Sequence, residues 1–248
     1  MTASTRPLLT LLSAVLLLCR ATLFSQPEPS ASPDASALAS SEKSGAEVLY
    51  VPGTYQDWKP AAAPTLNAVP GSAGLFEGYV NFVGTGPQEF KFTNAPDWTH
   101  TNYGDGGPGT LNPDGKAGGL SVPNAGYYEL TADLNKKKWT ATKTDWSIIG
   151  DATPGGWDTD SKMTYDPTKQ VWTVSAVMKK AGSFKFRANN AWVIDFGVDN
   201  SGNLQYVDNP FFTYNAALKQ LTVPADGSYT ITLDLHISGK YTYSIVPN

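Results

Sequence analysis

Four of the seven tryptophans stand in turn-like segments rich in glycine, aspartate and asparagine: Trp58, Trp98, Trp157 and Trp192. An indole is flat and apolar on both faces, so it can stack on the apolar C–H face of a sugar ring while neighbouring polar groups bond the hydroxyls. Two indoles set at an angle suit a helical polymer such as amylose better than a flat one. The alternative for each tryptophan is burial at the base of a loop, where it would pack one end of a fold.

Cations that would complete such a site lie on segment 184–187, which reads Phe-Lys-Phe-Arg. A strand turns alternate side chains to opposite faces. The phenylalanines are therefore expected to point into the core, and Lys185 and Arg187 to share the outer face. In the first half of the chain Lys91 takes the place of Lys185. Asn189 follows the segment as a further candidate for bonding hydroxyls.

The elements that position these residues occur twice along the chain, and such a repeat determines the architecture. Segment 182–189 matches 87–94, with a tryptophan shortly after each. Segment 221–229 matches 120–128 in a Val-Pro-x-x-Gly-x-Tyr pattern, whose final tyrosine is expected to pin a strand corner. Because the blocks recur in the same order, chance similarity is a poor explanation.

Each copy has the pattern of short strands closed by glycine and proline turns. Segments 171–177 and 228–235 alternate or concentrate β-branched and aromatic residues. We therefore predict an all-β fold of two tandem immunoglobulin-like β-sandwich modules, residues 47–144 and 145–248.

The N-terminus is predicted to be a targeting segment. Residues 1–25 contain an apolar run that suits a signal peptide and is short for a membrane-spanning helix. Two cleavage sites are open: Cys19 as a lipidated residue, or cleavage after Ser25. Residues 26–46, dominated by Ser, Pro and Ala, are predicted to form a disordered tether. These features predict export, with the protein at the cell surface or outer membrane, or secreted.

Composition excludes several classes of partner. The formal net charge of -4 and pI near 5.1 argue against nucleic acid, which requires a basic surplus. A single cysteine and two histidines, His100 and His236, disfavour a cysteine or histidine metal site. No metal and no cofactor are predicted.

The repeated tryptophans, the Phe-Lys-Phe-Arg segment and the Val-Pro-x-x-Gly-x-Tyr pattern resemble those of the SusE/SusF family of outer-membrane glycan-binding proteins of Bacteroidetes. More loosely, they resemble the starch-binding modules of amylases and pullulanases. The resemblance covers both copies. It implies non-catalytic binding of starch-like α-glucan or maltooligosaccharide, and display beside an outer-membrane glycan importer. The ligand-binding residues predicted are Trp58, Lys91 and Trp98 in the first copy, and Trp157, Lys185, Arg187, Asn189 and Trp192 in the second.

The first copy departs from this pattern, with Thr93 in place of Arg187 and an Ala- and Pro-rich insertion at residues 60–74. Two other functions stay open: a structural or adhesive surface protein, and an accessory part of a glycoside hydrolase. A glycosidase needs two positioned carboxylates in one site, whereas here the distinctive residues repeat in small modules. We therefore expect that the chain is not an enzyme.

Overall fold

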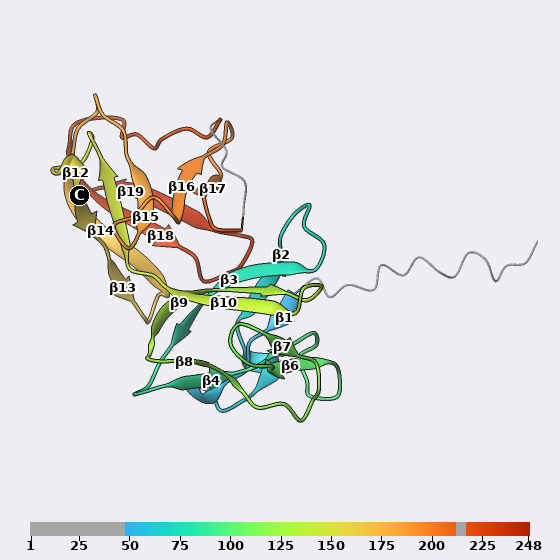
Figure 1. The fold of residues 1–248 in the computed structure, drawn as a ribbon. Coiled ribbons are helices and arrows are strands. Elements are labelled where there is room, and N and C mark those ends of the chain that lie inside the picture. Colours follow the sequence, from blue (N-terminus) through green and yellow to red (C-terminus); the bar gives the residue numbers. More distant parts are fainter. Residues whose placement is uncertain (1–47, 212–216) are drawn as a thin grey trace, which may run out of the picture. The chain divides into compact units, whose positions relative to one another are not determined.

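The computed structural model describes residues 48–211 and 217–248, which belong to one compact unit (Figure 1). The predicted signal segment 1–25 with Cys19, and the tether 26–46, lie outside the described residues. Apart from two single-turn 3-10 helices, η2 (Thr54–Gln56) and η3 (Pro60–Ala62), the regular elements of the described residues are strands. The all-β prediction is confirmed.

The second module is a sandwich of two antiparallel sheets. One sheet consists, in spatial order, of β12 (Gly156–Lys162), β11 (Trp146–Gly150), β15 (Lys185–Ala188), β16 (Asp195–Val198) and β17 (Leu204–Asp208). The other consists of β13 (Thr164–Asp166), β14 (Val171–Met178), β18 (Gly227–Asp234) and β19 (Thr242–Pro247). Phe184, Phe186 and Phe196 are fully buried between the sheets together with Ile231 and Leu233.

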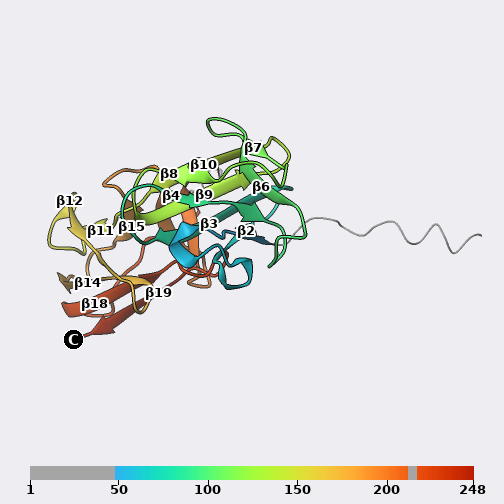
Figure 2. The same cartoon turned by 90° about the horizontal axis from the view of Figure 1, so that it is seen from below.

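The first module wraps one long antiparallel sheet around its own core. In spatial order the sheet consists of β10 (Lys138–Lys143), β9 (Gly126–Asp133), β3 (Leu75–Phe82), β2 (Thr65–Ala68), β1 (Val48–Tyr50), β5 (Phe92–Thr93), β6 (Asn102–Asp105) and β7 (Leu111–Asn112). A separate pair is formed by β4 (Gln88–Phe90) and β8 (Leu120–Val122). Strands β10, β9, β3 and β2 lie side by side in Figure 2.

One strand, β2, explains why the first module has one long sheet where the second module has two separate sheets. In the first module β2 pairs with both β1 and β3, so it joins the two layers along one edge. In the second module the segment at the same place in the chain order forms two strands, β12 and β13, each paired with a different sheet. Residues 60–74, expected to form an insertion, contain β2, so this stretch belongs to the sandwich.

The expected strand alternation is confirmed in both modules. Phe90 and Phe92 have no exposed surface in the first core, and Phe184 and Phe186 have none in the second. The repeat also holds at the level of pairing, because Phe90 lies opposite Leu120 and Phe184 opposite Leu221.

The predicted tyrosine corners are present in both copies. The hydroxyl of Tyr128 donates to the carbonyl of Asn124, and that of Tyr229 to the carbonyl of Ala225, each at 3.0 Å. Each bond ties the start of a long strand, β9 or β18, to the turn that precedes it. The tyrosine ring is buried at both corners.

We expect Tyr229→Phe to lower the free energy of unfolding by about 1 kcal/mol, because it removes one hydrogen bond and leaves a carbonyl of the turn without this donor. Urea denaturation of the intact chain measures the loss. Tyr128→Phe should behave alike, and Tyr50→Phe, at a half-buried tyrosine outside both corners, serves as the control. An unchanged stability in both corner variants would contradict a structural role for these bonds.

Candidate carbohydrate-binding platforms

In the second module two exposed indoles lie side by side. Trp157 is the second residue of β12, not part of a loop as expected, and Trp192 lies in the turn region after β15. Their ring centroids are 6.2 Å apart and the ring planes differ by 42°. The side chains keep 38% and 45% of their surface exposed. We call this pair the second platform.

The first module holds an equivalent pair, the first platform. The rings of Trp58 and Trp98 are also 6.2 Å apart, at an angle of 45°. Trp98 is 41% exposed, and its Nε1 donates to the carbonyl of Trp58 at 3.3 Å. The same separation and tilt therefore arise twice, from tryptophans that sequence analysis had paired.

Neighbouring strands hold the elements of each site. In each module the strand before the first tryptophan is hydrogen-bonded to the strand that follows or carries the lysine: β1 pairs with β5, and β11 with β15. Because both pairs are antiparallel, the end of β11 at Ile149 lies opposite Lys185, at the start of β15.

Backbone strain marks the segments that hold the indoles. Asp57 and Trp58 have φ angles of 59° and 57°, and Asn189 and Asn190 both have 56°. This left-handed region costs a bulky residue such as tryptophan free energy, and such strain concentrates at binding sites. The Trp58 turn is closed by a hydrogen bond from its backbone N–H to the carbonyl of Gly53, at 2.9 Å.

Beneath Trp192 lies a layer of paired charges. The Arg187 guanidinium binds Asp160 through two hydrogen bonds, of 2.9 and 2.7 Å, and its Cζ lies 4.5 Å from the centroid of the Trp192 ring. Hydrogen bonds from Arg187 hold the pKa of Asp160 below its ordinary value. Asp160 thus neutralises the charge of Arg187, and Arg187 supports the Trp192 indole and lies beside the platform surface.

Lys185 belongs to the same layer. Its Nζ lies 2.8 Å from Oδ2 of Asp195 and 5.5 Å from the centroid of the Trp192 ring. Burial raises the pKa of Asp195, although the adjacent lysine acts in the opposite direction. The lysine has two further ammonium hydrogens that this single bond does not use.

The equivalent residues of the first module carry fewer charges. Lys91 Nζ bonds the carbonyl of Gly115 at 3.1 Å and approaches Oδ1 of Asn102 at 3.5 Å. Asn102 occupies the place of Asp195, because it lies opposite Thr93 as Asp195 lies opposite Arg187. Thr93 is fully buried and bonds the carbonyl of Ala95. The first platform therefore carries a lysine without the carboxylate that neutralises its counterpart.

Asn189 serves the junction between the modules. Its Oδ1 accepts from the backbone N–H of Asp145 at 2.9 Å, and its Nδ2 donates to the carbonyl of Lys143 at 2.8 Å. Both ends of its side-chain amide thus bind the connection between β10 and β11. We therefore leave Asn189 out of the platform that we propose below, and keep the other seven predicted residues.

Sequence reasoning missed two residues of the second platform. Asp160 holds Arg187, and Asn190 Nδ2 donates to Asp160 Oδ2 at 2.6 Å, which fixes the turn that leads to Trp192. The alternation within segment 156–162 was the available signal, since it puts Asp158 and Asp160 on one face of β12.

The other three tryptophans are buried or partly buried. Trp172 is 5% exposed, and Trp139 is partly buried against the first core. Trp146, at the start of β11, is buried and contacts Tyr79 of the first module, with ring centroids 6.0 Å apart.

Neither a helix that could span a membrane nor a metal cluster occurs in the part of the chain that the structure describes. No helix there has the length and apolar character needed to cross a membrane. No three His, Cys, Asp or Glu side chains are grouped there so as to share a metal ion.

A family model supports the resemblance inferred from the sequence for the second module. Residues 145–244 match the family model of the SusF/SusE starch specific CBMs, that is, carbohydrate-binding modules. Among solved structures, SusF from Bacteroides thetaiotaomicron aligns at 15% sequence identity and a TM-score of 0.32, over 82% of this chain and 48% of that one. The chain thus spans about half the length of that protein. A comparison with curated sequences gives no significant match.

Proposed function

We propose that the chain is a non-catalytic binding protein for starch-like α-glucans and maltooligosaccharides, with one platform in each module. The observation that carries the proposal is the recurrence of one geometry, two indoles 6.2 Å apart and tilted by 42° or 45°, of which Trp98, Trp157 and Trp192 are exposed and Trp58 is half-buried. The match of residues 145–244 to starch-specific modules supports the same ligand class.

The tilt of the indoles favours a curved ligand. Two rings in one plane would suit a flat glucan, whereas rings inclined at about 45° follow successive glucose units of a helical α-glucan. Each indole covers the apolar face of one sugar ring, and the hydrogens of Lys91 or Lys185 that are not already bonded point to its hydroxyls. Arg187 adds donors at the edge of the second platform.

The carboxylates near the second platform support binding without catalysis. A glycosidase needs one carboxyl to donate a proton and another that attacks or activates water. Asp160 and Asp195 instead form ion pairs with Arg187 and Lys185, whose side chains are largely buried. In this proposal the predicted export segment carries the modules to the cell surface, where an outer-membrane glycan importer would be the partner.

Affinity electrophoresis of the intact chain tests the ligand class. We expect retardation in gels that contain amylose or pullulan and none in dextran or β-glucan, because only the first two offer curved α-1,4-linked chains. No reducing sugar should be released on incubation with amylose. Equal mobility in all gels would favour an adhesive or structural protein, and release of reducing sugar would favour an enzyme.

A further inference from the structure

Two glutamates of the first module lie buried against the second. Glu77 on β3 and Glu129 on β9 share one sheet face, because Glu129 lies opposite Tyr79, two residues from Glu77. They are 5% and 1% exposed. We call the contact region around them the module seam. It consists of Glu77, Tyr79, Tyr127 and Glu129 of the first module, and Trp146, Tyr206, Asn209 and Tyr241 of the second.

The backbones approach closely beside the seam. A Cβ atom at Gly78 would lie 2.5 Å from Oγ of Ser238, so glycine is needed where the loop before β19 rests on β3. Ser238 donates a hydrogen bond to the carbonyl of Thr65 in β2. The first module is therefore in intimate contact with the segment that carries Tyr241.

The donors that the second module offers to the two carboxylates are uncharged. Tyr241 OH lies 2.9 and 3.0 Å from the two oxygens of Glu77. Tyr206 OH lies 2.8 Å from Oε1 of Glu77 and 3.4 Å from Oε1 of Glu129. Asn209 Nδ2 lies 2.5 Å from Oε1 of Glu129. No ion pair to either glutamate occurs among the described residues.

The hydrogen-bond network around Glu77 and Glu129 has fewer donor hydrogens than acceptor oxygens. Tyr206 OH can donate one hydrogen, yet it contacts both carboxylates and also Tyr79 OH at 2.9 Å. Oε2 of Glu129 is buried and has no hydrogen-bond partner among the described residues. A proton on one carboxyl would supply the missing donor and remove one of two like charges that share a buried site.

Other titratable groups near the seam do not neutralise the pair. Tyr79, Tyr127, Tyr206 and Tyr241 face it from β3, β9, β17 and the loop before β19, and burial raises the pKa of all four. The further charged or titratable side chains at its edges are Tyr165, Asp234 and His236 near Tyr127, and Lys240 next to Tyr241.

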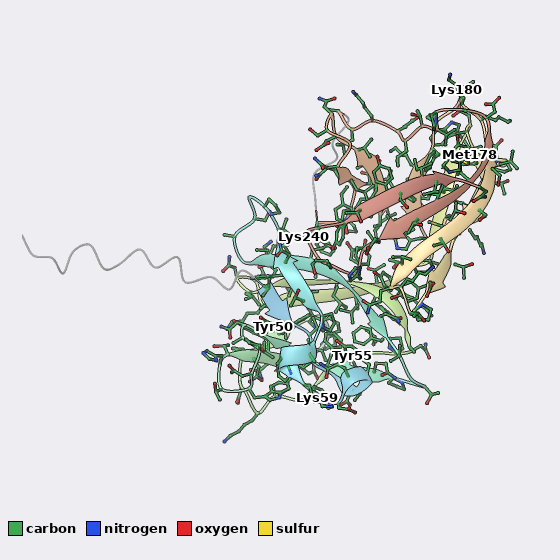
Figure 3. All side chains as sticks on the ribbon, turned by 180° about the vertical axis from the view of Figure 1, so that it is seen from behind. Tyr50, Tyr55, Lys59, Met178, Lys180 and Lys240 are labelled. Carbon is green, nitrogen blue, oxygen red and sulfur yellow. The ribbon has the colours of Figure 1, made fainter. Side chains whose placement is uncertain are left out.

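Solvent can reach Glu77 through a cavity between the modules. It has a volume of about 450 Å³ and is lined by Asn67 and Glu77 of the first module and by Tyr206, Lys240 and Tyr241 of the second. Lys240 is labelled in Figure 3 at this place. Protons can therefore exchange without unfolding of either core.

We propose that the two modules dock through a proton held between Glu77 and Glu129, so that their contact weakens as the solution becomes alkaline. This pH-dependent contact between the modules does not involve the sugar-binding platforms. Burial and the charge of Glu129 raise the pKa of Glu77 to about 8, and burial raises that of Glu129 to about 7. Since both values lie above the ordinary value of 4.5, the stabilisation of docking is fully present below that pH and is lost progressively as the pH rises to about 8.

Urea denaturation of the intact chain between about pH 5 and pH 9 tests the proposal. For each proton that the folded chain keeps and the unfolded chain has released, the unfolding equilibrium constant should rise about tenfold per pH unit between the ordinary pKa and the raised one, and it should level off above the raised pKa. In Glu77→Gln/Glu129→Gln the amides cannot ionise, so this rise should disappear. Small-angle scattering should show wild type, but not the double variant, expanding at pH 9.

Matched variants separate the pair from other titrating groups. Glu89→Gln, at an exposed glutamate on β4, and His236→Gln should both keep the wild-type decline between about pH 5 and pH 8. If the double variant declines with pH as steeply as wild type, the proposal is overturned. If the double variant does not fold, wild type alone decides, because a stability that does not fall from pH 5 to pH 8 would also overturn it.

Discussion

Asp160→Ala is expected to lower the free energy of unfolding by about 3 kcal/mol, because removal of one partner from a buried ion pair leaves the other charge uncompensated. The Arg187 and Asp160 side chains are only 10% and 4% exposed. The substitution also removes the hydrogen bond that Asn190 makes to Asp160. Both supports of Trp192 are then lost, so binding by the second platform should fall with stability. Chemical denaturation and calorimetry with maltoheptaose measure the two effects.

Two variants show whether burial of the Arg187–Asp160 ion pair causes the expected loss of stability. Asp160→Asn keeps the shape of the side chain and one oxygen acceptor, and should lose less stability than Asp160→Ala. Lys169→Ala breaks an exposed pair of 3.9 Å with Asp166 and should change stability by less than about 0.5 kcal/mol. If Asp160→Ala is as mild as Lys169→Ala, the charge layer does not support the platform in the way described above.

Long glucan chains are expected to bind the intact chain at least about tenfold more tightly than maltoheptaose does, because the second platform engages at a high effective concentration once the first is occupied. The connection from β10 to β11 is short and is clamped by Asn189, so the modules are linked without a flexible spacer. Calorimetry with amylose fractions of increasing length measures the gain.

Single variants identify the source of this gain. Trp98→Ala and Trp192→Ala each leave one intact platform, so the preference for long chains should vanish in both while binding of maltoheptaose persists. A preference of the same size in wild type and in both variants would show that the two platforms do not act together.

Local sequence patterns predicted the features that depend on one strand or one turn. Alternation in segment 184–187 put the phenylalanines inside and Lys185 beside Trp192, because a strand has a period of two wherever it lies. The repeated Val-Pro-x-x-Gly-x-Tyr pattern predicted Tyr128 and Tyr229 as corner residues. The pairing of the tryptophans followed from their equivalent places in the two copies.

Features that depend on strand order or on contact between modules could not be predicted in this way. Asp160 meets Arg187 across β11, and the register of β12 on β11 shifts at an irregularity between Ile148 and Gly150. Glu77 and Glu129 lie on strands whose alternation alone would assign them to solvent. They are buried because a second module covers that face, and nothing in the local pattern of β3 or β9 records this.

The central claim is that the paired indoles bind α-glucan, and retardation of Trp98→Ala/Trp192→Ala in an amylose gel tests it most directly. Stacking on an indole contributes roughly 1–3 kcal/mol by analogy with base stacking on aromatic side chains, so one lost indole in each platform should abolish most retardation. Val177→Ala, at a 66% exposed residue of β14, should be retarded like wild type. Near-UV circular dichroism verifies that each variant is folded. A folded double variant that is retarded as strongly as wild type would contradict the claim.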